Sequence, residues 1–276
     1  MNPDLQVLLR DWRLGPDGPL RDSGHAKLLP VRRDGAAMML KWTEELAELR
    51  GFEQLQAWQG GGAVPVLARR GNALLMARAS GGQDLAHMAR AGQDEAALRL
   101  LCRQAQRLHR VAPPPGLLPL AEWFAELWPM AEAHPVLAES RDMARALLAR
   151  AEAPVSLHGD LHHGNLLDFN GAWLVIDPKG LIGPAEFDFA VMFANPDLDD
   201  PSQPVAVLPG RCDARLALVA RETGFAPQHL LRWILAWSGL SAAWFLSDAQ
   251  VDRDRLAVDL HVMAWASARL RDQSPA

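Results

Sequence analysis

158-HGDLHHGN-165 is the stretch on which the interpretation of this 276-residue sequence depends. Its three histidines and its aspartate fall within six residues, and they admit three interpretations. Zinc could be bound by side chains of the right chemical type, namely His158, Asp160, His162 and His163. Alternatively, the histidines only satisfy a tight polar loop, or the stretch is the catalytic loop of a phosphoryl-transfer enzyme. No HExxH helix is present and the other histidines are scattered, which counts against zinc.

The spacing around this stretch favours phosphoryl transfer. That chemistry needs a carboxylate to orient the attacking hydroxyl, and an asparagine and a second carboxylate to hold Mg²⁺. Asp160 and Asn165 are five positions apart, as in kinase catalytic loops, and His158 precedes the aspartate by two. Asp177 ends the next apolar run, and the Asn-Gly turn at 170–171 should bring it back beside the loop.

Such an enzyme also needs a strand lysine near the ATP phosphates, held by a glutamate from the following helix. The run 36-AAMMLKW-42 supplies Lys41 directly before a glutamate-rich helix. We prefer Glu48 as its partner, because Glu48 lies one helical turn before Phe52 on the face that should meet the sheet. Three other glutamates of this helix stay open as partners: Glu44, Glu45 and Glu53.

The apolar pattern divides the chain into a nucleotide-binding lobe, 1–79, and a catalytic and substrate-binding lobe, 80–276. The first lobe contains four extended runs and one helix with Thr43 as its N-cap; the runs are 25–33, 36–42, 63–70 and 73–79, and the helix is 43–58. Ser80-Gly81-Gly82 is the predicted linker, and the pattern after it is mainly helical. A short β insertion, 154–160 and 173–177 joined by the turn at 170–171, carries the opening motif. This pattern predicts an α+β fold in which a small antiparallel sheet with one helix precedes a larger helical lobe.

Charge and composition exclude several kinds of partner. The net charge is −5 and the pI is about 6.0, so neither nucleic acid nor an anionic membrane surface is expected to bind. Cys102 and Cys212 are isolated, which fits a reducing compartment. The apolar window 230–247 contains Arg232 and three serines, so we expect a buried core helix rather than a membrane span. The N-terminus lacks the pattern of a signal peptide. We expect a cytoplasmic protein.

Two longer segments resemble a known family. They are 156-SLHGDLHHGNLL-167 and 173-WLVIDPKGLIGPAEFDFA-190, and both look like the aminoglycoside phosphotransferases. With 60-GGGAVPVLA-68 they are similar, more narrowly, to the streptomycin 6-kinase and hydroxyurea phosphotransferase branch, in which Asp-Pro-Lys replaces the Asp-Phe-Gly of protein kinases. The resemblance covers about Trp12 to Trp265. It implies a protein-kinase-like bilobal fold that uses ATP and Mg²⁺.

The resemblance also implies a role for individual residues. Asp160 would be the catalytic base, and Asn165 and Asp177 would be the Mg²⁺ ligands. Lys41 would contact the phosphates of ATP. Two residues would have structural roles: His158 would brace the loop, and Asp188 would be a buried carboxylate that accepts backbone N–H bonds from it.

Two backbone segments should complete the nucleotide site. The sequence has no GxGxxG motif, so we place the phosphate-covering turn at Ser23-Gly24-His25-Ala26, where backbone N–H groups would face the phosphates. The resemblance places the hinge that holds adenine through backbone groups at Met76-Ala77-Arg78-Ala79.

A cationic acceptor would be stabilised by carboxylates near Asp160. Candidates from the helical lobe are Glu186, Asp197, Asp199, Asp200, Asp248 and Asp252. Trp237 and Trp244 share a helix face and could stack on a ring or a guanidinium. The simpler alternative is a solvated acidic loop together with two core tryptophans.

The sequence therefore predicts an ATP- and Mg²⁺-dependent small-molecule kinase that phosphorylates a hydroxyl of an aminoglycoside-like, streptomycin-type substrate. One alternative keeps the fold and changes the acceptor to hydroxyurea, a sugar or an amino alcohol. Another is a catalytically silent nucleotide-binding module. We expect a monomer or a homodimer.

Overall fold

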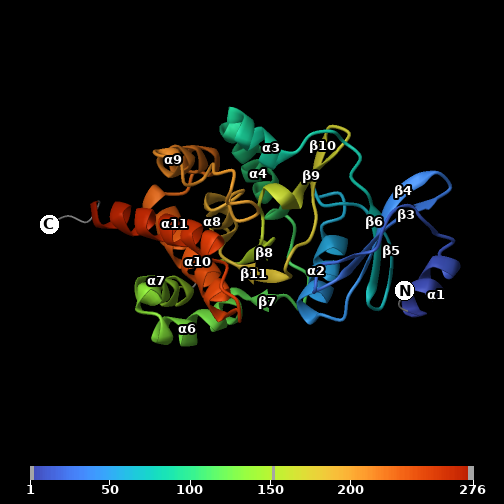
Figure 1. Ribbon diagram of the computed structural model, residues 1–276, viewed down its shortest axis with the longest axis horizontal. Helices are drawn as coiled ribbons and strands as arrows, with labels where there is room; N and C mark the ends of the chain where they lie inside the picture. Colours follow the sequence, from blue (N-terminus) through green and yellow to red (C-terminus); the bar gives the residue numbers. More distant parts are fainter. Residues whose placement is uncertain (1–2, 151–152, 273–276) are drawn as a thin grey trace.

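The computed structural model describes residues 3–150 and 153–272. Its N-terminal part is an antiparallel sheet at one end of the molecule, with strand order β1-β3-β4-β6-β5 and β2 beside β3 (Figure 1). The strands are β1 (Gly15–Pro16), β2 (Arg21–Asp22), β3 (Lys27–Arg33), β4 (Ala36–Trp42), β5 (Val66–Arg70) and β6 (Ala73–Ala77). The predicted turn between β3 and β4 is confirmed, because Asp34 and Gly35 both have positive φ, 51° and 80°, as tight hairpins require.

One helix of this part was not predicted. α1 (Pro3–Asp11) packs on one face of the sheet, where Leu5 and Leu8 join a buried cluster with Leu29 and Leu40. The signal was present, because Leu5, Leu8 and Leu9 recur at helical spacing. The prediction that this lobe contains one helix was therefore wrong.

The opposite face of the sheet is covered by α2 (Leu46–Ala57). Phe52 and Leu55 of α2 are buried in the same cluster as Leu74 of β6. Thr43 was wrongly predicted as the N-cap, since the helix begins three residues later with Glu45 at the cap position. The Thr43 hydroxyl instead ties the end of β4 to neighbouring loops: it donates to the His25 carbonyl (2.6 Å) and accepts from the Glu45 N–H (3.0 Å).

The remainder is mainly helical, as predicted. Its helices are α3 (Leu85–Met88), α4 (Asp94–Leu108), α5 (Leu120–Trp123), α6 (Leu127–Ala133), α7 (Ala138–Leu148), α8 (Phe187–Ala190), α9 (Arg211–Thr223), α10 (Pro227–Ser247) and α11 (Arg253–Asp272). Its short strands are β7 (Leu118–Pro119), β8 (Val155–Leu157), β9 (Leu166–Phe169), β10 (Ala172–Val175) and β11 (Leu181–Gly183), which lie between the helices and the N-terminal sheet (Figure 1).

The β insertion differs from the prediction in its pairing. The turn at Asn170-Gly171 joins β9 to β10, so the stretch after the opening motif forms the hairpin. The segment before the motif, β8, pairs with β11 instead. The predicted pairing of 154–160 with 173–177 was therefore wrong, because β9 follows the motif directly and reaches β10 through a two-residue turn. The motif consequently lies between two different sheets.

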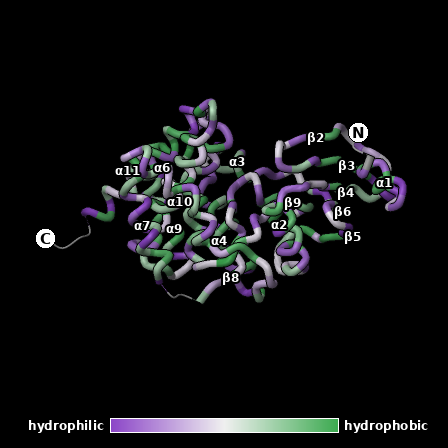
Figure 2. Tube along the Cα trace, turned by 90° about the horizontal axis from the view of Figure 1, so that it is seen from below, coloured by the Kyte–Doolittle hydropathy of each residue, from purple (hydrophilic) through white to green (hydrophobic). Residues whose placement is uncertain are grey.

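α10 forms the centre of the helical part. By length and composition it could cross a membrane, but 72% of its most apolar window is buried inside the protein. It packs against α11, α7 and α8, and Trp233 and Trp237 belong to the buried core. The expectation of a core helix is confirmed. Hydrophobic and hydrophilic residues alternate along the helices throughout this part, as is typical of elements with one buried face (Figure 2).

Backbone hydrogen bonds join the N-terminal part of the molecule to the mainly helical part. The Val64 N–H donates to the Val175 carbonyl (2.9 Å), and the Val175 N–H donates to the Gly62 carbonyl (3.0 Å). Further on, the Gly81 N–H donates to the Asp168 carbonyl (2.9 Å). The N-terminal sheet is thus connected to β10 and β9, which follow the opening motif, 158–165. The lobe boundary between residues 79 and 80 stays a prediction, and residues 1–2, 151–152 and 273–276 of these lobes lie outside the described residues.

Asp259 of α11 should make the stability of the protein pH-dependent. It is fully buried, and burial raises the pKa of its carboxyl well above the ordinary 3.8, which the Ser241 hydroxyl offsets only in part. The neutral form therefore contributes stability that is complete below about pH 4 and is lost as the pH rises toward the raised pKa, by about 1.4 kcal/mol per unit. Asp259→Asn should flatten this decline, as measured by urea unfolding at pH 5 and pH 8. Equal declines in the variant and the wild-type protein would contradict the assignment.

Candidate active site

Asp160 and Asn165 lie together in the loop after β8. The Asn165 amide nitrogen donates to the Asp160 carbonyl (2.8 Å) and lies 3.3 Å from a carboxylate oxygen of the same residue. A short 3₁₀ turn, His163–Asn165, sets this spacing. The Asp160 side chain keeps about a third of its surface exposed, so its carboxylate can be reached by a substrate.

A buried carboxylate holds this loop in shape. Asp188 accepts the N–H groups of His158 (2.9 Å) and Gly159 (2.8 Å), and it pairs with His109 Nε2 at 2.7 Å. Burial alone would raise the pKa of Asp188, but the bonds from His109 and the loop outweigh it and lower the pKa. The backbone contacts are those that the resemblance implied for this residue. His109 was missed by sequence reasoning, since it stands alone at the C-cap of α4.

His158 is fully buried and braces the loop from inside. Its Nε2 lies 2.9 Å from the Ile176 carbonyl, and its Nδ1 accepts the Asp160 N–H at 3.3 Å. These partners define a neutral ring with the proton on Nε2. Burial lowers the pKa of His158, which favours that neutral form. The histidine therefore links the catalytic loop to the strand that leads to Asp177.

Asp177 faces two lysines. Its carboxylate forms ion pairs with Lys41 and, at 3.3 Å, with Lys179. Burial alone would raise the pKa of Asp177, but these two ammonium groups outweigh it and hold the pKa well below its ordinary range. Asp177 is therefore ionised, as a metal ligand must be. Its own φ of 62° turns the chain sharply after β10.

Lys41 reaches Asp177 because of the alternation along β4. Met38, Leu40 and Trp42 point to the α1 side of the sheet, which leaves Lys41 on the α2 side. There it forms an ion pair with Glu48 in the first turn of α2. The lysine is therefore paired with the preferred glutamate. Of the other candidates, Glu53 pairs with Arg69 at the surface.

Gly51 lets α2 approach the loop after Asp177. A side chain at this position would overlap the Pro178 carbonyl oxygen. Gly51→Ala should therefore push α2 outward and separate Glu48 from Lys41, with a loss in kcat/KM for ATP of roughly 10²-fold. Steady-state kinetics measures the loss. Gly82→Ala is the matched control, because no atom lies within 4 Å of its added Cβ. Unchanged kinetics for Gly51→Ala would contradict this role.

Two polar residues of the site were missed at the sequence level. Gln54 of α2 is fully buried and bonds the Leu157 carbonyl (2.6 Å), while its carbonyl oxygen accepts the Gly180 N–H (3.0 Å). It thereby connects α2 to β8, before the catalytic loop, and to the loop after Asp177. Lys179, the second residue after Asp177, contacts three carboxylates of the site. A buried glutamine in a helix and a lysine in a DPK motif give little signal when read alone.

Several N–H groups in the backbone segments predicted to bind the nucleotide are already hydrogen-bonded within the protein. In the turn between β2 and β3, the Ser23 N–H donates to the Ala26 carbonyl (3.0 Å), and the Gly24 N–H donates to the Asp22 carboxylate (3.0 Å). Along the predicted hinge, the N–H groups of Ala77 and Arg78 are bonded to carbonyls of neighbouring segments, and Met76 is buried. Ala79 follows β6 and is half-buried. These assignments stay predictions, and Ala79 is the hinge residue best placed to donate to adenine.

The residues present fit Mg²⁺ better than zinc. Mg²⁺ is commonly held by one or two protein oxygens together with substrate phosphates. Asn165 and Asp177 supply such oxygens, since the Asn165 amide nitrogen is bonded to Asp160 and leaves the amide oxygen as ligand. Within residues 3–150 and 153–272, no group of three or more histidine, cysteine or acidic side chains is arranged to hold a metal. The described residues therefore do not support the zinc interpretation of the histidine-rich loop, in which His158 is instead bonded to backbone groups.

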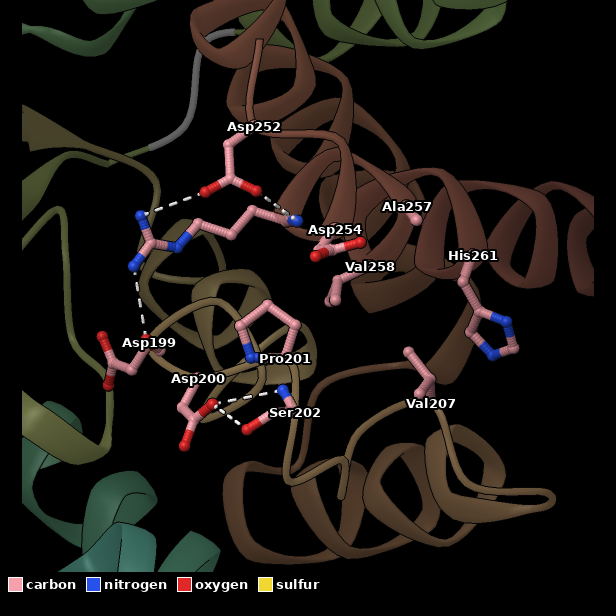
Figure 3. A pocket seen from close by; sticks show the side chains of 11 residues that line it. Asp199, Asp200, Pro201, Ser202, Val207, Asp252, Asp254, Ala257, Val258 and His261 are labelled. Carbon is pink, nitrogen blue, oxygen red and sulfur yellow. Dashed lines mark hydrogen bonds and ion pairs between the residues drawn. The ribbon is translucent and has the colours of Figure 1, made fainter.

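A cavity of about 770 Å³ opens between the loop that contains residues 199–202 and the first turns of α11 (Figure 3). Four carboxylates and one guanidinium line it: Asp199, Asp200, Asp252, Asp254 and Arg255. His162 connects the cavity to the catalytic loop, with Nδ1 3.6 Å from Asp199 and Nε2 3.8 Å from Asp160. Burial alone would lower the pKa of His162, but these two carboxylates outweigh it and raise the pKa.

The structure separates the residues that were predicted to bind the acceptor into two groups. Asp199, Asp200 and Asp252 line the cavity, whereas the other candidates lie elsewhere. Glu186 is buried in an ion pair with His229 (3.2 Å), and Trp244 packs edge-on against Trp123. Asp248 is exposed at the C-cap position of α10. Asp197 accepts three backbone N–H groups, and Trp237 is a core residue. We therefore restrict the proposed acceptor site to the cavity.

An aspartate–asparagine pair and a second aspartate beside a lysine–glutamate pair are the arrangement expected of a phosphotransferase of the protein-kinase-like class. The whole-chain likeness agrees: a thermostable mutant of aminoglycoside phosphotransferase APH(4)-Ia, solved with AMP-PNP and hygromycin B, superposes with a TM-score of 0.69. That match covers 98% of this chain and 99% of the other at 12% identity, so it establishes the fold. The α+β, protein-kinase-like fold is confirmed.

The chain belongs to the aminoglycoside/hydroxyurea antibiotic resistance kinase family, whose model matches residues 11–249. It is 50% identical over 258 residues to a streptomycin 3''-kinase of Klebsiella pneumoniae, covering 92% of this chain and 97% of that protein. It is 34% identical over 194 residues to a streptomycin 6-kinase of Streptomyces griseus, covering 64% of this chain and 61% of that protein. The protein is thus a kinase of small molecules that acts on hydroxyl groups, as the sequence predicted.

Proposed function

We propose that this protein transfers the γ-phosphoryl group of ATP to the 3''-hydroxyl of streptomycin in the cytoplasm. The observation that carries the proposal is the position of Asp160, which contacts Asn165 on one side and is connected through His162 to Asp199 of the acidic cavity on the other. The likeness to a streptomycin 3''-kinase over nearly the whole chain supports the 3'' position over the 6 position.

In this proposal each residue has one task. Asp160 accepts the hydrogen bond and then the proton of the acceptor hydroxyl, which orients its oxygen toward the γ-phosphorus. Lys41, held by Glu48, neutralises charge on the ATP phosphates. Asn165 and Asp177 would hold Mg²⁺, which would neutralise charge on the phosphates. Asp188 and His158 act on the loop and not on the substrate, because both are fully buried.

The cavity fits a cationic acceptor. Streptomycin carries two guanidinium groups, and guanidinium pairs well with carboxylates through two parallel hydrogen bonds. Asp252 is already paired with Arg255 at 3.5 Å, but the four carboxylates of the cavity outnumber its one guanidinium. Several carboxylates therefore remain to meet a substrate cation.

A panel of acceptors tests this proposal. ADP release should be fastest with streptomycin and slower or absent with hygromycin B, hydroxyurea and a simple amino alcohol, with a reaction lacking acceptor as the blank. Fast turnover of hydroxyurea alone would favour the alternative acceptor. ATP binding in a thermal-shift assay without turnover of any acceptor would favour the silent nucleotide-binding module and contradict the proposal.

A further inference from the structure

Lysine is rare in this chain and concentrated at the site. Of the 28 lysine and arginine residues only three are lysines, Lys27, Lys41 and Lys179, and two of these three meet at Asp177. Arginine supplies the ordinary surface cations. A compact ammonium is not interchangeable with a planar guanidinium where several carboxylates converge on one point. Lys179 is therefore one of the few compact ammonium groups of this chain, and it lies where several carboxylates converge.

The contacts of Lys179 define that position. Its Nζ lies 3.3 Å from Asp177 Oδ2, 3.6 Å from Asp160 Oδ2 and 3.7 Å from Glu48 Oε1. The same ammonium group thus faces the proposed base, the proposed metal ligand and the glutamate that holds Lys41. The side chain is about one-fifth exposed, so its charge is only partly screened by water.

The backbone around Lys179 is fixed on both sides. The Lys179 N–H donates to the His158 carbonyl (2.9 Å), and the next N–H, of Gly180, donates to Gln54 (3.0 Å). Gly159 leaves room for the side chain, because an added Cβ there would lie 3.2 Å from the Lys179 Cβ. The ammonium group is therefore held in the site by the loop that contains it rather than by its carboxylate partners alone.

We propose that Lys179 is a catalytic cation of this kinase, which holds Asp160 and Asp177 together before nucleotide binds and then contacts the transferred phosphoryl group of ATP. The inference rests on the proposed function. In the first state the ammonium occupies the space between the base and the metal ligand, where it opposes a free divalent cation. In the second it adds a protein-borne positive charge where negative charge develops during transfer. No covalent bond to Lys179 is involved.

If Lys179 has these two tasks, its replacement should raise the affinity for a free divalent cation and lower kcat. Removing the charge relieves its repulsion of a divalent cation at Asp177, so Lys179→Met should bind free Mn²⁺ about tenfold more tightly without nucleotide. The same variant should lose kcat with streptomycin by roughly 10²–10³-fold, as expected when one preorganised charge at the transition state is removed. A residue that only supported the structure would weaken both metal binding and turnover.

The experiment compares four proteins: the wild-type chain, Lys179→Met, Lys179→Arg and Arg110→Met. Mn²⁺ affinity is measured by electron paramagnetic resonance, and kcat by ADP release at saturating streptomycin. Arg110 is exposed in the turn after α4 and is not among the contacts of Lys179, so its replacement removes the same charge and both readouts should match the wild-type protein. Lys179→Arg should have a kcat between those of Lys179→Met and the wild-type protein. It should bind Mn²⁺ with the same affinity as the wild-type protein.

Mn²⁺ binding by Lys179→Met that is equal to or weaker than wild-type binding would overturn the inference, as would a kcat within about threefold of wild type. If Lys179→Met did not fold, a Lys179→Arg protein with tighter Mn²⁺ binding than wild type would overturn it too, because the positive charge is kept. Failure of wild-type turnover with streptomycin would refute the proposed function instead, and the Mn²⁺ measurements would then decide the role of Lys179 alone.

Discussion

Asp160→Asn should lower kcat by roughly 10²–10⁴-fold while leaving the affinity for ATP within about twofold of wild type. Asparagine preserves the size of the side chain but cannot accept the proton of the acceptor hydroxyl. The Asp160 carboxylate lies 3.3 Å from the Asn165 amide and 3.6 Å from Lys179, so the substitution alters one charge within an otherwise intact site. Steady-state kinetics and nucleotide titration measure the two quantities separately.

Asp142→Asn is the control for this substitution, because Asp142 is an exposed aspartate of α7 far from the site in the fold. It should keep wild-type kinetics. Turnover by Asp160→Asn at a rate close to wild type would remove Asp160 as the base. A large loss of ATP affinity without a loss of kcat would indicate that the residue serves nucleotide binding instead.

Asp177→Asn should lose the effect of Mg²⁺ on nucleotide binding and lower kcat/KM by roughly 10³-fold. In the wild-type protein Asp177 is ionised and faces Lys41 and Lys179, so it presents a full negative charge to a divalent cation. An amide is a much weaker ligand for Mg²⁺. ATP titrations with Mg²⁺ and with a chelator distinguish the two proteins.

In those titrations Mg²⁺ should tighten ATP binding by the wild-type protein and leave binding by Asp177→Asn nearly unchanged. Binding in the presence of chelator should be similar for both. If Mg²⁺ tightened ATP binding equally in the two proteins, the metal would have other ligands and the role of Asp177 would be contradicted.

The centre of the site could be predicted because its parts are close in sequence. Asp160, Asn165 and Asp177 fall within eighteen positions, and a two-residue turn between them leaves few ways to fold the segment. Lys41 followed from its place in an apolar run directly before the glutamate-rich helix, and its pairing with Glu48 followed from the helix face that Phe52 defines. Local patterns were sufficient for these residues.

The supporting residues could not be predicted because their partners are far away in sequence. His109 meets Asp188 across 79 positions, and Gln54 meets Ser156 across 102. Neither residue repeats a motif or breaks a pattern. The residues proposed to bind the acceptor could be separated only in the structure, for the same reason. Glu186 and Trp244 have suitable chemistry, but their neighbours His229 and Trp123 are set by helix packing that composition does not specify.

The most direct test identifies the phosphorylated product. The wild-type protein is incubated with streptomycin, ATP and Mg²⁺, and the product is purified and assigned by ¹H–³¹P correlation spectroscopy. The proposed mechanism predicts a single phosphate on the 3''-hydroxyl with the wild-type protein and none with Asp160→Asn. A phosphate on another hydroxyl would contradict the proposed position, and the absence of phosphorylated streptomycin from an ATP-binding protein would contradict the proposed reaction.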